Sequence, residues 1–313
     1  MIMAEFIKDV YNKDIKDLFL NEIELDKYPP RWWERLFESS CRAEKELSKD
    51  LCCFTVDEII EFYKYLDKNS FEALLVININ LIKYGDWALG NSLIIDGQNH
   101  YTEINNSIVM KCINKMGVIK SILTLDDMMQ VCKKIKNEQD RFIYFALFEG
   151  IKGKTYDEII NLKMSDIDEK NMTATLCSGR TIKVSKEFIR AAKSADAQTS
   201  YIMENGQLRK LIPSSRIYKE KANVSVGNMP KSIYRVILKN NETVDGLNKN
   251  INSNSIFHSG MIHYFNEIAR ANNMSVREIM DEKPELFEDI YYKYNFNPMM
   301  RSRFLMKFEY FLV

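Results

Sequence analysis

Glycine and proline are scarce in this chain of 313 residues, which contains 11 and 6 of them. Long disordered or low-complexity stretches are therefore not expected, and no segment repeats with a period of about 20 to 50 residues. Histidine is rarer still, with three residues, and none of the six cysteines forms a Cys-x-x-Cys pair. The sequence thus predicts no metal site and no cofactor, and it favours free thiols in a reducing compartment.

Long apolar runs are also missing. The longest mostly apolar stretch, residues 71–82, includes one glutamate and two asparagines, and it is too short and too polar to span a bilayer. The first ten residues carry Glu5, Lys8 and Asp9 without a long apolar core, so they are not expected to form a signal peptide. These absences predict a cytoplasmic protein with no membrane partner.

The overall composition is that of a folded globular protein, with 46% hydrophobic and 28% charged residues, and the length favours two domains. A formal net charge of zero argues weakly against a nucleic-acid binder, but the charges are unevenly placed. Residues 1–70 hold 11 Lys or Arg against 16 Asp or Glu, whereas residues 205–249 hold nine against three. Such asymmetry fits a protein that presents a basic face to a polyanion, although chance clustering on a solvated surface would give the same pattern.

Helical periodicity dominates the first third of the chain. Thr55 and Glu58 form a capping box that marks one helix start. The predicted helices cover approximately residues 30–48, 55–66, 69–84 and 104–115, with a turn-rich tract over residues 86–101. Together these elements predict a small all-helical domain over residues 1–117.

The second domain, residues 118–313, is predicted to be mostly helical after a linker at residues 116–123. Thr124 is expected to cap its first helix. Residues 168–184 change to an alternating pattern, which predicts a short β-hairpin with its turn at residues 177–180. The other predicted helices cover approximately residues 138–148, 156–162, 185–192, 232–240, 258–271, 276–280, 287–294 and 298–311. The predicted fold class is therefore mainly α with one small β-hairpin or sheet.

The segment FIYFALFEGIKGKTYDEIINLKMSDID, residues 142–168, resembles the opening of the catalytic domain of tyrosine recombinases, the phage integrase family. In that family a helix ends in Thr-Gly-Leu-Arg, the next helix starts with Glu-Leu, and Leu-x-x-x-Asp-Ile leads into a β-hairpin. The positions that keep this frame are Gly150-Ile151, Glu158-Ile159, Leu162 and Asp166-Ile167, and the following TATLCSGRTIKVSKEF is similar to the family's hairpin and next helix. The resemblance implies a two-domain tyrosine-recombinase-like architecture, with a core-binding-like domain before a catalytic-like domain.

The family's chemistry implies two arginines that should be found. A tyrosine attacks a DNA phosphate while the arginines clamp the non-bridging oxygens, because a guanidinium matches phosphate geometry and keeps its charge. The first arginine should follow Gly150-Ile151. That position holds Lys152 if three residues are inserted before Tyr156, or Thr155 if there is no gap, and neither is Arg.

The second arginine should lie in a His-x-x-Arg box, and NSNSIFHSGMIHYF is the stretch that resembles it. One alignment puts Phe257 at the arginine and Asn254 at the first histidine. The other matches the histidine to His258 and puts Met261 at the arginine. Both alignments remain open, and neither supplies an arginine. His258 and His263 are five residues apart, which is not the spacing of a metal-binding pair on a helix.

The resemblance leaves Tyr291, Tyr292 and Tyr294 as matches to the nucleophile, with Tyr292 taken as the degenerate position. In a chain with 16 tyrosines, aromatic packing of a C-terminal helix is the more economical explanation. The family's later Gly-His or Gly-Trp pair is absent from IMDEKPELFED. Loss of both arginines should abolish useful strand cleavage, whereas the fold and a DNA-binding surface need not be lost.

A recombinase architecture without its arginine clamp is similar to the integrase-like master repressors of SPbeta-type temperate phages. The resemblance implies a sequence-specific transcriptional repressor that binds double-stranded operator DNA, keeps a prophage silent in its bacterial host cell, and is not an enzyme. A homodimer and a phage-encoded regulator are further partners to consider. The apolar helix at residues 298–311 would either dock on a neighbouring copy or pack on its own domain.

The residues predicted to contact DNA fall into three groups. Lys152 and Lys154 flank Gly153 in a loop that suits phosphate binding. Arg180 lies at the hairpin tip, at the position where, by the resemblance, the family's catalytic lysine reaches the minor groove. The predicted helix over residues 232–240 carries the residues that would enter a major groove. The basic residues before it are expected to contact the DNA backbone. The full set is Lys152, Lys154, Arg180, Lys183, Arg209, Lys210, Arg216, Lys219, Lys231, Tyr234, Arg235 and Lys239.

Two other functions compete with this interpretation. The first is a diverged but active tyrosine recombinase that cuts and rejoins DNA through a phosphotyrosine intermediate, with Lys152 replacing one arginine. The second is a protein-interaction module that has lost DNA binding. A covalent tyrosine–DNA adduct would identify the first, and a lack of salt-dependent retention on DNA would identify the second.

Overall fold

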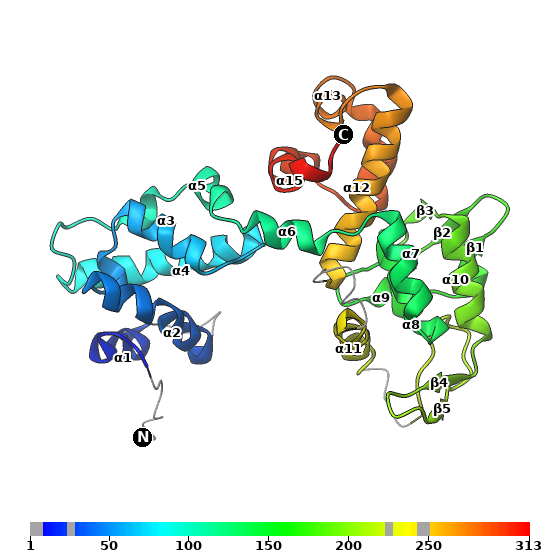
Figure 1. Cartoon of the computed structure of the whole chain (residues 1–313), viewed down its shortest axis with the longest axis horizontal. Coiled ribbons are helices and arrows are strands. Elements are labelled where there is room, and N and C mark those ends of the chain that lie inside the picture. The colour runs from blue at the N-terminus through cyan, green and yellow to red at the C-terminus, as the bar shows by residue number, and fades with distance from the viewer. Residues whose placement is uncertain (1–8, 24–28, 223–227, 243–250) are drawn as a thin grey trace. The chain divides into compact units, whose positions relative to one another are not determined.

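The computed structural model describes residues 9–23, 29–222, 228–242 and 251–313, and the chain divides into two compact units, Met1–Gly117 and Val118–Val313 (Figure 1). Glu5 and Lys8, and Lys249 of the basic stretch, lie outside the described residues. All six cysteines fall within the described part and are free thiols. None of the helices described has the length and apolar character that crossing a membrane requires.

The N-terminal unit is built from short helices around an aromatic core. Pro30 starts the second helix, at a position where a backbone N–H would have no partner within the helix. The predicted capping box of Thr55 and Glu58 starts the third helix. Its core includes the buried rings of Trp33, Phe37 and Tyr84. Its helices are α1 (Lys13–Glu22), α2 (Pro30–Leu47), α3 (Val56–Tyr65), α4 (Phe71–Gly90) and α5 (Asn106–Lys111), with short 3-10 turns at Leu51–Cys53 and His100–Glu103.

A buried ion cluster joins α1 to the end of α2. The Lys16 ammonium lies 2.6 Å from a Glu44 carboxylate oxygen and 3.1 Å from an Asp50 carboxylate oxygen. Ser40 and the backbone N–H of Leu51 also donate to Glu44. Burial raises the pKa of the Glu44 carboxyl, and the charge of Lys16 opposes that rise. One ammonium thus holds two carboxylates in the core.

Several boundaries in this unit differ from the prediction. Helix α1 was not predicted, α4 continues to Gly90 into the tract predicted to be turns, and α5 is shorter than the predicted helix. The predicted linker at residues 116–123 is wrong, because α6 (Lys115–Ser121) occupies most of it. This stretch contains no proline, and burial of Val118, Ile122 and Leu123 favours ordered structure over a solvated linker.

The C-terminal unit surrounds one buried helix, α8 (Glu138–Phe148), which packs against α10 (Lys186–Ala197) and α12 (Ser253–Asn272). Helix α12 begins five residues before the predicted start. A Cβ atom at Gly260 would overlap the carbonyl oxygen of Phe148, so glycine is what lets α12 approach the end of α8 this closely. The other helices are α7 (Leu125–Lys134), α9 (Asp157–Asn161), α11 (Met229–Glu242), α13 (Val276–Glu282), α14 (Glu288–Lys293) and α15 (Arg301–Phe308).

Two small antiparallel sheets complete this unit (Figure 1). The predicted hairpin is present as β2 (Thr173–Thr175) and β3 (Thr181–Lys183), and β1 (Ile167–Asp168) adds a third strand beside β2. The expectation of a single sheet is wrong, because β4 (Ser200–Ile202) pairs with β5 (Leu208–Lys210). The fold is otherwise mainly helical, as predicted.

The C-terminal segment packs part of its apolar surface on its own unit, and docking on a neighbouring copy stays a prediction. Phe304, Leu305 and Phe308 of α15 are buried. The side-chain amide of Asn266 on α12 donates to the carbonyl of Phe311 at 2.6 Å and accepts the N–H of Val313 at 3.1 Å. The amide therefore holds the backbone of the last residues at two points.

Candidate nucleic-acid interface

A cavity of about 500 Å³ lies where the loop after α8 meets the tip of the β2–β3 hairpin. We call it the hairpin cavity. The loop reaches it because Gly150 and Gly153 adopt positive φ angles of 81° and 71°, which end α8 and turn the chain. Its lining brings together residues far apart in sequence, among them Lys152, Lys154, Glu158, Arg180, Phe257 and Tyr294.

Lys152 is held inside this cavity by uncharged partners. Its ammonium donates to the side-chain oxygen of Asn254 and lies 5.6 Å from the centre of the Phe257 ring. Burial lowers the pKa of the Lys152 amine. Of the two positions left open for the second arginine, Phe257 lines the cavity beside Lys152, whereas Met261 is 3% exposed in the core.

Arg180 is bound within the protein. Its guanidinium contacts both carboxylate oxygens of Glu158, at 2.8 Å each, and donates to the carbonyl oxygens of Tyr292 and Lys293 at 3.1 and 2.7 Å. Glu158 is buried and also accepts the Ser178 hydroxyl at 2.6 Å. Arg180 therefore ties the hairpin to α14, and its predicted contact with DNA would require it to leave these partners.

The three C-terminal tyrosines have different surroundings. Tyr294 is buried, its hydroxyl donates to the carbonyl of Phe148, and burial raises the pKa of that hydroxyl. Tyr291 stacks on Phe296 with ring centres 5.5 Å apart, as expected for aromatic packing. Tyr292 is 52% exposed, and its hydroxyl accepts the backbone N–H of Thr181 at 3.3 Å. Tyr292 is thus the most solvent-accessible of the three.

A second cavity, of about 590 Å³, lies between the β4–β5 hairpin and α11. We call it the basic groove, defined by Arg209, Lys221, Arg235 and Lys239, which line it. Glu204 at its edge approaches Lys239 at 3.4 Å. The groove brings together cations from three separate segments on an open surface of the kind that phosphates bind.

Lys221 and Tyr201 are functional candidates that the sequence reasoning missed. The Lys221 ammonium lies 3.5 Å from the centre of the Tyr201 ring, and the Tyr201 hydroxyl donates to Asp140 at 2.8 Å. Burial lowers the pKa of Lys221, while the Asp140 charge opposes that shift. One signal was available, because Asn205-Gly206 is a strong hairpin turn signal beside the basic stretch, and Gly206 adopts a φ of 79°.

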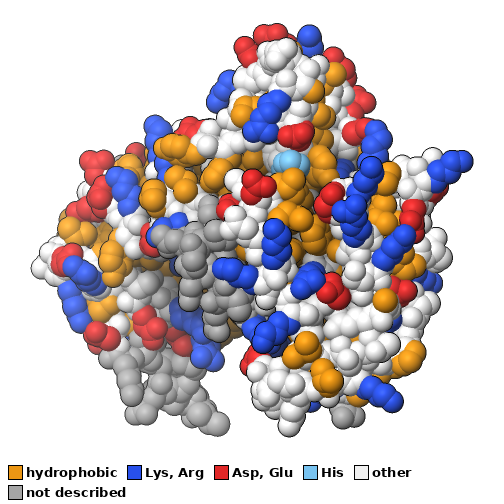
Figure 2. All heavy atoms as spheres, turned by 45° about the vertical axis from the view of Figure 1, so that its right-hand side comes forward, with side chains coloured by type: hydrophobic (Ala, Val, Ile, Leu, Met, Phe, Trp, Pro, Cys, Tyr) orange, Lys and Arg blue, Asp and Glu red, His pale blue; other side chains and the backbone are white. Residues whose placement is uncertain are grey.

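The remaining predicted DNA contacts line neither cavity. Lys183 pairs with Asp289 at 2.6 Å, Arg216 approaches Glu220 at 4.0 Å, and Lys219 is largely buried against Asp196. Lys210, Lys231 and Tyr234 are exposed. Figure 2 shows Lys and Arg side chains interspersed with acidic and apolar ones over the face that it presents. Within the described ranges, no three His, Cys, Asp or Glu side chains are grouped to hold a metal ion.

His258 gives the C-terminal unit a predictable pH dependence. Desolvation, with smaller contributions from Lys307 and Lys152, lowers its pKa from 6.5 to about 3. The folded state disfavours the protonated form of His258. Folding stability is therefore highest above pH 6.5, where the side chain is neutral in both the folded and unfolded states, and it falls as the pH drops toward 3. We expect the urea midpoint, followed by far-UV circular dichroism, to fall between about pH 7 and pH 5 less in His258→Gln than in the unaltered protein. An equal fall in both proteins would assign the pH dependence to other groups.

Comparison with known proteins identifies the family. Models of the MrpR family match twice, as "MrpR, N-terminal core-binding domain" over residues 10–90 and as "MrpR, C-terminal catalytic domain" over residues 122–310. The SPbeta prophage-derived uncharacterized protein YopR of Bacillus subtilis (strain 168) is 22% identical over 207 residues, which cover 64% of this chain and 62% of YopR. The match therefore spans less than two thirds of that relative's length.

Three solved structures align with this chain at lower sequence identity. The Tn1549 transposon integrase (aa 82-397), solved in complex with circular intermediate DNA, is 15% identical, with a TM-score of 0.45 and coverage of 93% of this chain and 94% of that one. The XerA recombinase is 12% identical, with a TM-score of 0.33 and coverage of 82% and 83%, and the integrase from mycobacterium phage Brujita is 11% identical, with a TM-score of 0.33 and coverage of 95% and 96%. From its two family matches, the chain belongs to the MrpR family, with core-binding and catalytic domains of the tyrosine-recombinase type.

Proposed function

We propose that this protein binds operator DNA sequence-specifically as a transcriptional repressor that keeps a prophage silent, and that it does not cut DNA. One observation carries the proposal. In the hairpin cavity, the ammonium of Lys152 faces the amide of Asn254 and the ring of Phe257. A phosphoryl-transfer site needs fixed cations aimed at the phosphate oxygens, and neither open position for the second arginine, Phe257 or Met261, supplies one.

The internal pairing of Arg180 supports the same proposal. Its guanidinium pairs with the buried carboxylate of Glu158. This carboxylate already provides the negative charge that a scissile phosphate would otherwise bring to Arg180. Tyr294, one of the matches to the nucleophile, is buried with its hydroxyl bonded to a backbone carbonyl. A group in that position has no access to a DNA phosphate unless the local packing opens.

The basic groove supports DNA binding without chemistry. Its four cations come from β5, from the segment before α11 and from α11 itself, so the groove and the helix surface beside it form one basic region. Arg235 and Tyr234 are exposed on α11, where they can contact base edges while neighbouring cations contact phosphates. The relation to a prophage-derived protein is consistent with a prophage regulator.

A diverged active recombinase is the second candidate, and Tyr292 is the observation that favours it. This tyrosine is 52% exposed next to Arg180, whose guanidinium contacts the Tyr292 carbonyl. The matching family model also describes the C-terminal domain as catalytic. This function would require Lys152 to act as the only cation of the clamp, which should reduce catalysis by a factor of roughly a hundred or more.

A gel-shift experiment tests the proposed binding. Fragments of the source genome are offered to the full chain at two salt concentrations, with excess competitor DNA. We expect selective retention of a few fragments, and an affinity that falls steeply as salt rises because phosphate contacts release counterions. Equal retention of all fragments would contradict sequence-specific binding, and a lack of salt-dependent binding would favour the interaction-module function instead.

A further inference from the structure

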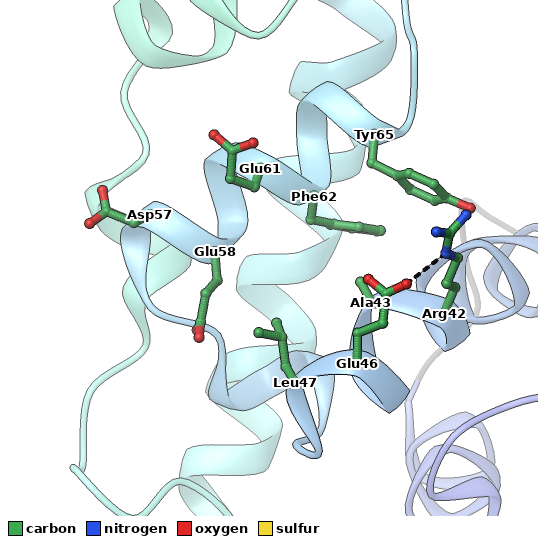
Figure 3. Close-up of a pocket in the computed structure, with 9 residues that line it drawn as sticks. All are labelled: Arg42, Ala43, Glu46, Leu47, Asp57, Glu58, Glu61, Phe62 and Tyr65. Carbon is green, nitrogen blue, oxygen red and sulfur yellow. Dashed lines mark hydrogen bonds and ion pairs between the residues drawn. The ribbon is translucent and has the colours of Figure 1, made fainter.

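The N-terminal unit carries a groove that the proposed function does not use. It has a volume of about 400 Å³ and lies between α2 and α3 (Figure 3). We call it the α2–α3 groove. Its apolar lining comes from Leu47, Phe62 and Tyr65, and Figure 3 shows the Phe62 and Tyr65 rings extending between the two helices. Tyr65 is 52% exposed and Leu47 is 39% exposed, so apolar surface faces solvent here.

Carboxylates surround this apolar lining. Glu46, Asp57, Glu58 and Glu61 line the groove, against Arg42 alone among the cations that line it. Glu46 pairs with Arg42 at 2.8 Å and Glu61 with Lys64 at 2.7 Å, and these four side chains are more than half exposed. Glu58 pairs with Lys49 at 2.6 Å, and this pair is less exposed. Such surface pairs contribute little stability and are easily exchanged for other partners. With three of the four carboxylates paired, Asp57 leaves the groove with a small negative excess, which favours a cationic partner over DNA.

The C-terminal unit carries a surface that combines exposed methionines with basic residues. Its α15 region exposes Met299, Met300, Met306 and Tyr310, with exposed fractions of 89%, 43%, 41% and 61%. Helix α15 also carries Arg301, Arg303 and Lys307. The opposite face of the helix is anchored by buried residues, so the exposed face is fixed in place. Exposed methionines are typical of surfaces that adapt to a partner.

We propose that the α2–α3 groove of one copy receives the α15 region of a second copy. The methionines would pack on Leu47, Phe62 and Tyr65, and the basic residues of α15 would face the carboxylates around the groove. The contact is small, so the association is weak in free solution. Copies bound at neighbouring DNA sites would associate more completely, because DNA raises their effective concentration. The effect of DNA rests on the proposed DNA binding, whereas the contact between copies rests on these two surfaces alone.

Charge reversal on the full chain tests this proposal. Sedimentation velocity without DNA should show a concentration-dependent monomer–dimer equilibrium that weakens at high salt. The groove variant Glu46→Lys/Glu61→Lys and the helix variant Arg303→Glu/Lys307→Glu should each weaken self-association by about tenfold or more. Because a closed homodimer uses both surfaces in both copies, a mixture of the two variants should form dimers with one native contact and one contact in which both charges are reversed. The mixture should therefore associate more strongly than either variant alone. Glu169→Lys, an exposed reversal outside both surfaces, is the matched control and should leave association unchanged.

Several results would overturn the proposal. A chain that stays monomeric at all concentrations, dimers that neither variant weakens, or a mixture that associates no better than its components would each do so. A monomeric chain whose groove still binds a synthetic helix of lysine and leucine, and no longer binds it in Glu46→Lys/Glu61→Lys, would assign the groove to another protein. Far-UV circular dichroism of each variant ensures that loss of association is not loss of folding.

Discussion

Replacement of Lys16 by methionine is expected to lower the free energy of unfolding of the N-terminal unit by about 3–5 kcal/mol. The side chain is fully buried, and its ammonium is the cation shared by Glu44 and Asp50. Without it, two buried carboxylates keep only neutral donors, among them the Tyr84 hydroxyl, which donates to Asp50 at 2.8 Å. A buried charge without its partner costs more free energy than the intact pair contributes. The loss of stability should therefore be far larger than the loss caused by breaking a surface pair.

Tryptophan fluorescence during urea unfolding measures this effect selectively, because Trp32, Trp33 and Trp87 are the three tryptophans of the chain and all lie in the N-terminal unit. Lys45→Met is the matched control. Lys45 pairs with Asp9 at 2.7 Å on the surface, so its loss should barely move the urea midpoint. Equal shifts in the two variants would contradict the account of the buried cluster.

The largest functional effect is expected in the basic groove. The double substitution Lys221→Ala/Arg235→Ala should weaken operator binding by on the order of a hundredfold. The slope of log affinity against log salt should also fall, by about 1 for each DNA phosphate that the variant no longer neutralises. The two side chains come from different segments and line one groove, so both can contact one stretch of DNA backbone. Fluorescence anisotropy at several salt concentrations gives affinity and slope together.

Two further variants make this measurement specific. Lys193→Ala removes an exposed lysine that pairs with Glu169 outside the groove, and it should leave both affinity and slope unchanged. Tyr201→Phe keeps the ring under Lys221 but removes the hydroxyl that donates to Asp140, so it should reduce affinity less than Lys221→Ala. If Lys193→Ala weakens binding as much as the groove variant, the DNA-binding surface lies elsewhere.

Local sequence signals predicted much of the fold. The predicted caps at Thr55 and Thr124 mark true helix starts, and the predicted hairpin is present as β2 and β3. The β4–β5 hairpin was not predicted because its strands are three residues each and one carries two charges. The α6 segment was misassigned because its short helix depends on burial of apolar residues, which local propensity does not reveal.

The candidate sites were harder to predict than the fold. The motif frame around residues 150–158 located one side of the hairpin cavity, but the pairing of Arg180 with Glu158 depends on how the hairpin folds back. Charge counting found the basic stretch, although it could not separate Arg209 and Arg235, which share a groove, from Lys219, which is largely buried against Asp196. The role of each of these residues depends on contacts between residues far apart in the sequence, which local sequence patterns do not reveal.

The central claim is that this recombinase fold binds DNA without cutting it. The most direct test uses a fragment selected by gel shift, nicked near the bound site so that a cleaved strand end diffuses away and a covalent intermediate accumulates. After incubation, a denaturing gel shows whether labelled DNA travels with the protein. We predict selective binding on the native gel and no covalent product on the denaturing gel. A covalent product that disappears in Tyr292→Phe would contradict the account and establish an active recombinase.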